Sequence, residues 1–182
     1  MALPEAVQQW YLGGGGFTTA QDLLPLAASV SPGALPNYDA DRDNFAGLLV
    51  FKGDGLAETD RARMQRWLGV PAEPRLLGDA YLEFWGAARN FSPATNVTID
   101  AGIYDCAGDG SDCVLLGSGG VTIDQSGIGE DFGRAVISLG SVDHTFGPGR
   151  VVLVKIAPPR ESEAQAWLAY GTATYPTRLL IG

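Results

Sequence analysis

Hydrophobic and polar residues alternate in short runs along most of the chain, and turn-forming residues separate these runs about every 8–12 residues. The run 151–156 is apolar on both faces, which predicts a central strand that is covered on both sides. Residues 60–68 fit a helix or an amphipathic strand, and we choose the strand. Residues 17–45 contain three prolines and little periodicity, so we expect at most one short strand there. The remaining predicted strands are 7–12, 46–52, 80–87, 96–105, 113–117, 120–124, 134–139, 142–146, 150–157, 165–171 and 177–181.

This pattern predicts an all-β protein. Glycine (25) and proline (11) together make about a fifth of the 182 residues, while 46% of the residues are hydrophobic. A chain with this composition can bury a core, and it needs many turns to do so. The many short strands show no βαβ rhythm, a pattern that is typical of a β-sandwich or a β-barrel. Of the two we expect a two-sheet antiparallel β-sandwich that forms a single domain over 1–182.

The two cysteines predict a hairpin that is closed by a disulfide. Cys106 and Cys113 flank a stretch rich in turn formers, 108–111, and apolar residues lie on both sides of the pair. The alternatives are two free thiols in a reducing compartment, or a zinc site. The zinc site is poorly supported because the chain's one histidine, His144, is about 30 residues away. A disulfide would favour an extracellular or particle-surface setting.

Charge and missing motifs argue against several classes of function. The net charge is −9, from 12 basic and 21 acidic residues, which disfavours binding to nucleic acid or to anionic lipid. No apolar run approaches the roughly 20 residues of a membrane span, so we expect no membrane insertion. A Ser-His-Asp triad would have to use His144, and the G-x-S-x-G and phosphate-loop patterns are absent. We therefore expect no enzyme, and a hydrolase that uses two carboxylates is the weakest alternative.

Three alternating aspartates form the one candidate metal site. Asp39, Asp41 and Asp43 could converge on a hard cation such as a structural calcium ion. The loop is not an EF-hand, because Asn44 and Val50 occupy the positions where an EF-hand needs glycine and glutamate. The alternative is a solvated acidic turn in which the side chains cap the local backbone. No other cofactor is indicated.

One predicted strand has a face that suits ligand binding. Leu82 and Phe84 fall on one side of it, and Tyr81, Glu83 and Trp85 fall on the other. If the first pair faces the core, the second set forms an aromatic ladder with one carboxylate, which could stack and orient a sugar ring. The alternative is that both faces are covered, since large aromatic side chains are usually mostly buried.

Several stretches, taken in order, resemble a known kind of domain. They are 37–47, 88–91, 104–113, 137–142, 149–156 and 167–179. This ordered set, which spans roughly 37–182, is similar to jelly-roll-like β-sandwich domains of exported bacterial surface proteins. Such domains often lie beside repeat or protease modules. The resemblance implies a jelly-roll-like fold and an extracellular or cell-surface location, and it implies no defined activity.

We expect a non-catalytic, surface-displayed interaction module of adhesion or carbohydrate-binding type, whose partner is a surface glycan. The alternative is a structural assembly protein of a virus particle, a capsid decoration or fibre subunit that lies on the virion surface against neighbouring subunits. This alternative is favoured by a start at Met1 with no secretory signal after it. A final strand at 178–181 that could pair with another chain would also allow a homo-oligomer.

Overall fold

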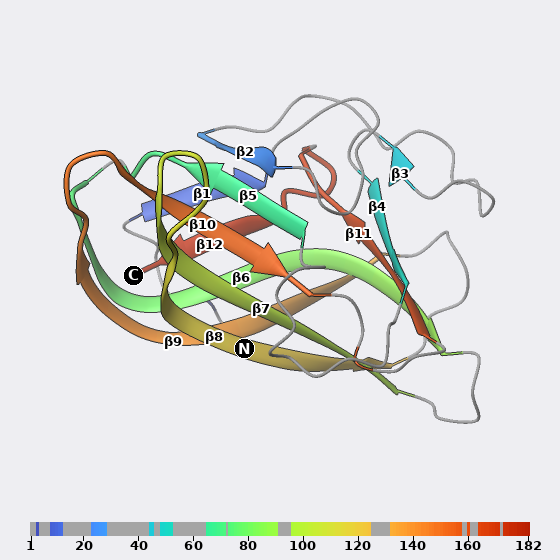
Figure 1. Cartoon of the computed structure of the whole chain (residues 1–182). Helices are drawn as coiled ribbons and strands as arrows, with labels where there is room; N and C mark the ends of the chain where they lie inside the picture. Colours follow the sequence, from blue (N-terminus) through green and yellow to red (C-terminus); the bar gives the residue numbers. More distant parts are fainter. Residues whose placement is uncertain are drawn as a thin grey trace.

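The computed structural model describes residues 3, 8–12, 23–28, 44–45, 48–52, 65–71, 73–90, 96–124, 132–157, 160, 164–171 and 173–182. These residues form twelve strands and no helix, so the all-β prediction is confirmed (Figure 1). In this part of the chain no helix has the length and hydropathy of a membrane span. The strands are β1 (Gln8–Leu12), β2 (Leu23–Ala27), β3 (Asn44–Phe45), β4 (Leu48–Lys52), β5 (Gln65–Gly69), β6 (Arg75–Asn90), β7 (Asn96–Ala107), β8 (Val114–Asp124), β9 (Gly133–Thr145), β10 (Arg150–Ile156), β11 (Ala164–Ala169) and β12 (Arg178–Ile181).

The strands form two antiparallel sheets, as the sequence predicts. Sheet A is built around β6, which pairs with β9 along one side and with β12 and then β11 along the other. It continues through β4 and β3 beyond β11, and through β1 beyond β12. Sheet B has the order β5-β10-β7-β8. Strand β2 connects the two sheets, because it pairs with β1 in antiparallel fashion and with β5 in parallel.

Alternating side chains from both sheets fill the space between them. Leu82 and Phe84 of β6 are fully buried in this core, as the sequence pattern predicts. Strand β10 lies between β5 and β7, and it is buried on both faces, which confirms the prediction of a central strand. Its inward residues, Val152 and Val154, join the core. Its outward residues, Val151 and Leu153, form a smaller cluster with Tyr104 and Cys106 of β7.

The free edges of the two sheets meet where β8 and β9 lie side by side (Figure 1). A methyl group at Gly117 would overlap the carbonyl oxygen of Leu139, and one at Gly119 would overlap that of Ser138. Only glycine therefore allows β8 to approach the β9 backbone this closely. The prediction of separate strands at 113–117 and 120–124 was wrong for this reason, because the glycines that indicated a turn are required by packing.

Strand β9 was likewise predicted as two strands, 134–139 and 142–146, and it is one. The pairing of β6 with β9 shifts register at Ala80, opposite Gly140, which has a φ of +92°. This is a bulge, which bends the strand without ending it.

The prediction of at most one short strand in 17–45 was also wrong, since β2 and β3 both lie there. The predicted strand at 60–68 exists as β5 from Gln65 onward, and 60–64 lies outside the described residues.

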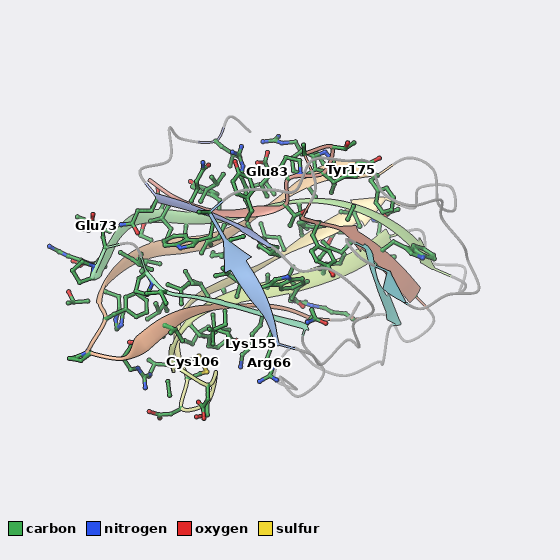
Figure 2. All side chains as sticks on the ribbon, turned by 90° about the horizontal axis from the view of Figure 1, so that it is seen from above. Arg66, Glu73, Glu83, Cys106, Lys155 and Tyr175 are labelled. Atoms are coloured by element: carbon green, nitrogen blue, oxygen red, sulfur yellow. A yellow bond between two sulfur atoms is a disulfide. The ribbon has the colours of Figure 1, made fainter. Side chains whose placement is uncertain are left out.

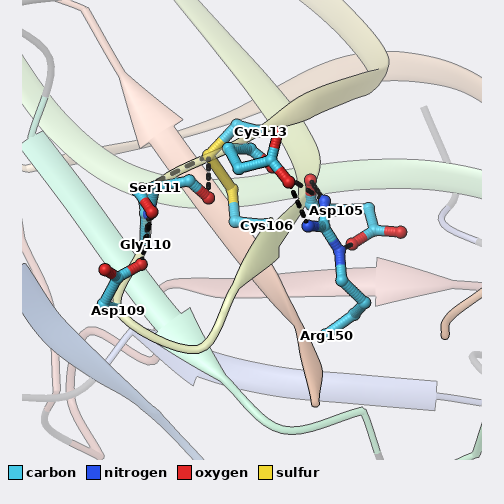
Figure 3. The surroundings of a disulfide bond; sticks show 8 residues. Asp105, Cys106, Asp109, Gly110, Ser111, Cys113 and Arg150 are labelled. Carbon is cyan, nitrogen blue, oxygen red and sulfur yellow. Dashed lines mark hydrogen bonds and ion pairs between the residues drawn. A yellow bond between two sulfur atoms is a disulfide. The ribbon is translucent and has the colours of Figure 1, made fainter. Parts of the chain in front are cut away.

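The predicted disulfide hairpin is confirmed. Cys106 and Cys113 are bonded with an S–S distance of 2.06 Å, and they join the end of β7 to the start of β8. Arg150 of β10 holds the loop from outside, because its guanidinium binds the carboxylate of Asp112 at 2.8 Å and that of Asp105 at 2.6 Å (Figure 3). The loop is therefore fixed both by a covalent bond and by a cation from the adjacent strand.

Candidate functional site

The outward face of β6 carries the side chains that the sequence singled out. Tyr81 and Trp85 are half-buried, and Glu83 between them is only 3% exposed. All three lie on the face opposite Leu82 and Phe84, so the predicted division of the strand into two faces is confirmed. Figure 2 shows Glu83 on the opposite side of the sandwich from Lys155 and the disulfide.

Two arginines from the neighbouring strands hold Glu83. Arg178 lies directly opposite it on β12, and its Nε donates to Oε2 at 2.6 Å. Arg134 of β9 lies opposite Trp85, and its Nε donates to the other oxygen, Oε1, at 2.5 Å. A carboxylate that is buried this deeply is tolerated only when it is paired and hydrogen-bonded. The neighbouring cations thus explain how an acidic side chain can be buried on this face.

Both arginines remain partly in solvent. The side chain of Arg134 is 44% exposed and that of Arg178 is 29% exposed. Partial burial acts to lower the pKa of Arg178, but the hydrogen bond and the charge of Glu83, with a further contribution from Tyr11, raise it above the ordinary value. Arg178 also donates from Nη1 to the side-chain oxygen of Gln9 at 3.2 Å. We call the five residues Tyr81, Glu83, Trp85, Arg134 and Arg178 the Glu83 surface.

Aromatic side chains and a buried hydroxyl border this surface near Trp85. Phe132, which precedes β9, and Tyr175, which precedes β12, pack edge to face with ring centres 5.2 Å apart. Figure 2 places Tyr175 on the same side of the molecule as Glu83. The hydroxyl of Thr177 donates to the carbonyl of Ala169 at 2.6 Å and accepts from the backbone N–H of Trp85 at 3.4 Å. Thr177 therefore supplies side-chain hydrogen bonds at the point where β6 stops pairing with β12 and begins to pair with β11.

This arrangement defines what the surface can do chemically. Both oxygens of Glu83 accept hydrogen bonds from the arginines, so the carboxylate orients the two guanidinium groups. It is therefore not free to accept a hydrogen bond from a ligand hydroxyl. The groups left for a ligand are the remaining guanidinium N–H donors and the faces or edges of the half-buried aromatic rings. The role of Tyr81, Glu83 and Trp85 in ligand binding stays a prediction.

Two further carboxylates are buried against arginines. Asp100 of β7, 2% exposed, accepts from Arg160 with both oxygens, at 2.6 and 2.7 Å. Asp105 accepts from Arg150, and its other oxygen lies 2.6 Å from Nε2 of His144. Within the described residues, no serine or cysteine joins this Asp–His pair, so the cluster reads as an anchor for the disulfide hairpin.

The predicted calcium site lies outside the part of the chain that the structure describes. Asp39, Asp41 and Asp43 belong to the segment 29–43, so their arrangement is untested. Among the residues described, no three His, Cys, Asp or Glu side chains gather closely enough to hold a metal ion.

Sequence analysis missed the two arginines of the Glu83 surface. Arg134 is 51 residues from Glu83 along the chain, and Arg178 is 95 residues away. Their proximity depends on which strands are neighbours and on the pairing register, and no local pattern carries that information. The one available signal was that each of two predicted strands has an arginine at or near its first position. An arginine side chain at such a position is usually solvated, so the signal did not indicate a partner.

Comparisons with known proteins inform the fold. No protein-family model and no curated protein matches the sequence. Solved structures do match: a CocE/NonD family hydrolase from Staphylococcus aureus (13% identity, TM-score 0.62), an aminopeptidase from the marine sediment archaeon Thaumarchaeota archaeon (15%, 0.63) and an alpha-amino acid ester hydrolase (12%, 0.64). The matches cover 98%, 95% and 95% of this chain, but only 37%, 36% and 35% of those chains. The chain thus spans little more than a third of the length of these enzymes and shares the fold of one region in each.

Proposed function

We propose that this chain is a non-catalytic interaction module of adhesion or carbohydrate-binding type, and that the Glu83 surface is its contact surface. The observation that supports this most directly is that Tyr81 and Trp85 are half-buried on one face of a sheet, on either side of a buried carboxylate that fixes two arginines. Side chains that are held in this way by strands lose little freedom when a ligand binds, which favours affinity.

The chemistry of this surface suits a glycan. A flat aromatic ring packs against the C–H face of a sugar ring, and it removes apolar area from water. Guanidinium N–H groups donate to the ring and hydroxyl oxygens of the sugar in a fixed planar fork. The surface thus combines an apolar platform with hydrogen-bond donors of defined direction, as small-ligand sites generally do.

We also propose that the sandwich is jelly-roll-like and that the module is displayed outside the cell or at the cell surface. The Cys106–Cys113 disulfide supports this location, because such bonds persist mainly in oxidising compartments. A purified chain that elutes as a 19.1 kDa monomer would agree with a displayed module. A stable trimer, pentamer or hexamer at micromolar concentration would favour a subunit of a virus particle instead.

Titration of the purified chain with a panel of glycans tests the proposal. We expect binding to at least one glycan, and we expect Trp85→Ala to abolish or strongly weaken it. The control is Val70→Ser, which changes an apolar side chain that is 75% exposed and directly follows β5. Binding that survives Trp85→Ala, or a chain that binds no glycan at all, would contradict the proposal.

A second candidate function follows from the comparisons. The matched hydrolases are nearly three times as long as the matched region, so this fold occurs there as one part of a larger enzyme. The Glu83 surface would then pack against a catalytic domain and would not bind a free ligand. The same titration distinguishes a glycan-binding module from an accessory domain. If the Glu83 surface packs against another protein domain, the chain should bind none of the glycans.

A further inference from the structure

Arg134 keeps an unused pair of donors next to the contact surface. It binds Glu83 through Nε alone, and within the residues that the structure describes its two amino groups, Nη1 and Nη2, have no hydrogen-bond partner. The side chain is 44% exposed, so these groups are accessible from solvent. The two parallel N–H donors of a guanidinium match the two oxygens of a carboxylate. The hydrogen bond from Nε to Glu83 fixes the orientation of the guanidinium, and with it the directions in which Nη1 and Nη2 can donate.

Trp85 lies beside this donor pair. It is directly opposite Arg134 in the pairing of β6 with β9, and side chains at such positions have Cβ atoms about 5 Å apart. The indole is half-buried, so part of it remains open to a ligand. An aromatic platform and a cationic fork are therefore adjacent. A sugar ring on the indole would place a carboxylate at its edge within reach of the arginine.

Charge narrows the choice of ligand further. Arg134 and Arg178 carry two positive charges against the one negative charge of Glu83, so this cluster has a net charge of +1 in a chain whose net charge is −9. One added carboxylate neutralises the cluster. A polymer with a charge on every residue would be repelled by the acidic rest of the molecule, most strongly at low ionic strength. The surface thus suits a ligand with an isolated negative charge.

We propose that Arg134 and Trp85 form a subsite for a carboxylate-bearing sugar residue within an otherwise neutral glycan. Arg134 binds the carboxylate through Nη1 and Nη2, and Trp85 packs against the sugar ring. Glu83 acts as a positioning residue that orients the guanidinium. This inference rests on the proposed function, since it names the class of glycan that the Glu83 surface selects.

The test uses two ligands that differ in one group. Methyl glucuronoside and methyl glucoside share the same ring, and only the first has a carboxylate in place of the CH₂OH group. NMR titration of the isotope-labelled chain gives both dissociation constants. We expect the acid to bind about tenfold more tightly, which corresponds to about 1.4 kcal/mol for a charge-assisted contact that is partly exposed.

Three variants localise the preference. Arg134→Gln should reduce the ratio of the two affinities to about one, and Arg134→Lys should keep only part of it, because a lysine retains the charge but not the fork. Trp85→Ala should weaken both ligands by similar factors and leave the ratio unchanged. The matched control is Arg75→Gln, which removes another partly exposed arginine from the same β6–β9 pair, about 33 Å farther along the strand. It should change neither affinity.

The outcomes separate the inference from the proposed function. Equal affinity for the two ligands would overturn the inference and leave the module's glycan-binding function in place. A preference for the acid that persists in Arg134→Gln would also overturn it, because the anion would then bind elsewhere. If neither methyl glycoside nor any glycan of the panel binds, the proposed function itself fails. Thermal unfolding of each variant confirms that the sandwich is intact.

Discussion

Breaking the Cys106–Cys113 disulfide should lower the stability of the protein by a predictable amount. The two cysteines are seven positions apart, so the bond closes a loop of about 8 residues. Closing a loop of that length removes unfolded-state entropy equivalent to about 2.5 kcal/mol at 25 °C. The folded hairpin should survive reduction, because Arg150 still binds Asp112 and Asp105 from the adjacent strand. The loss should therefore come almost entirely from the unfolded state.

The measurement is urea unfolding with and without a phosphine reductant, with free thiols counted after each run. We expect the free energy of unfolding to fall by about 2.5 kcal/mol, and the melting temperature to fall by about 5–10 °C for a chain of this size. The slope against urea should rise, since the reduced unfolded chain exposes more surface. A double variant, Cys106→Ala with Cys113→Ala, should lose more, because Cys106 is fully buried against Val151 and Leu153. An unchanged unfolding midpoint after complete release of the thiols would refute the reasoning.

Three further predictions concern the ion cluster, the contact between sheet edges and the hairpin turn. Glu83→Gln should destabilise the chain by about 2 kcal/mol in urea unfolding, because two charge-assisted hydrogen bonds weaken while both arginines can still be hydrated; no change would mean that the arginines do not depend on the carboxylate. Gly119→Ala should cost about 1–3 kcal/mol because its methyl group meets a β9 carbonyl, whereas Gly108→Ala, with ordinary contact distances, should cost less than 1 kcal/mol in the same assay. The side-chain hydrogen bond from Ser111, followed by that from its backbone N–H, holds the pKa of Asp109 below its ordinary value of 3.8. Stabilisation by these bonds is therefore complete above that pH and is lost as the pH falls through the lower pKa of the folded state. An NMR titration of Ser111→Ala should move the Asp109 pKa up toward 3.8, and a pKa that stays in place would contradict the assigned cause.

The parts of the fold that the sequence predicted are those governed by local alternation. The two faces of β6 follow directly from the period of two in residues 81–85, and the burial of both faces of β10 follows from its apolar run at 151–154. The disulfide hairpin could also be predicted from the sequence, because the turn formers lie between the two cysteines.

What the sequence could not show depends on contacts between distant segments. Gly119 indicated a turn, yet in the structure it lets the backbones of β8 and β9 approach each other. Gly140 also indicated a break, and it instead forms a bulge within one strand. The parallel pairing of β2 with β5 and the placing of two arginines around Glu83 both require the complete sheet order. The aromatic residues of the candidate site could thus be found from sequence, but their cationic partners could not.

The position of β12 has a consequence for how the chain folds during synthesis. Among the twelve described strands β12 comes last in the sequence, yet it lies inside sheet A between β6 and β1, where Leu180 pairs with Tyr81 and with Gln9. The ribosome adds roughly 5–20 residues per second, so roughly 10–30 s pass between the synthesis of β1 and the arrival of its partner. During that interval one edge of β1 and part of one edge of β6 lack their native neighbour, and they are open to pairing with other nascent chains. Sheet A therefore cannot be completed until the chain has been synthesised as far as β12.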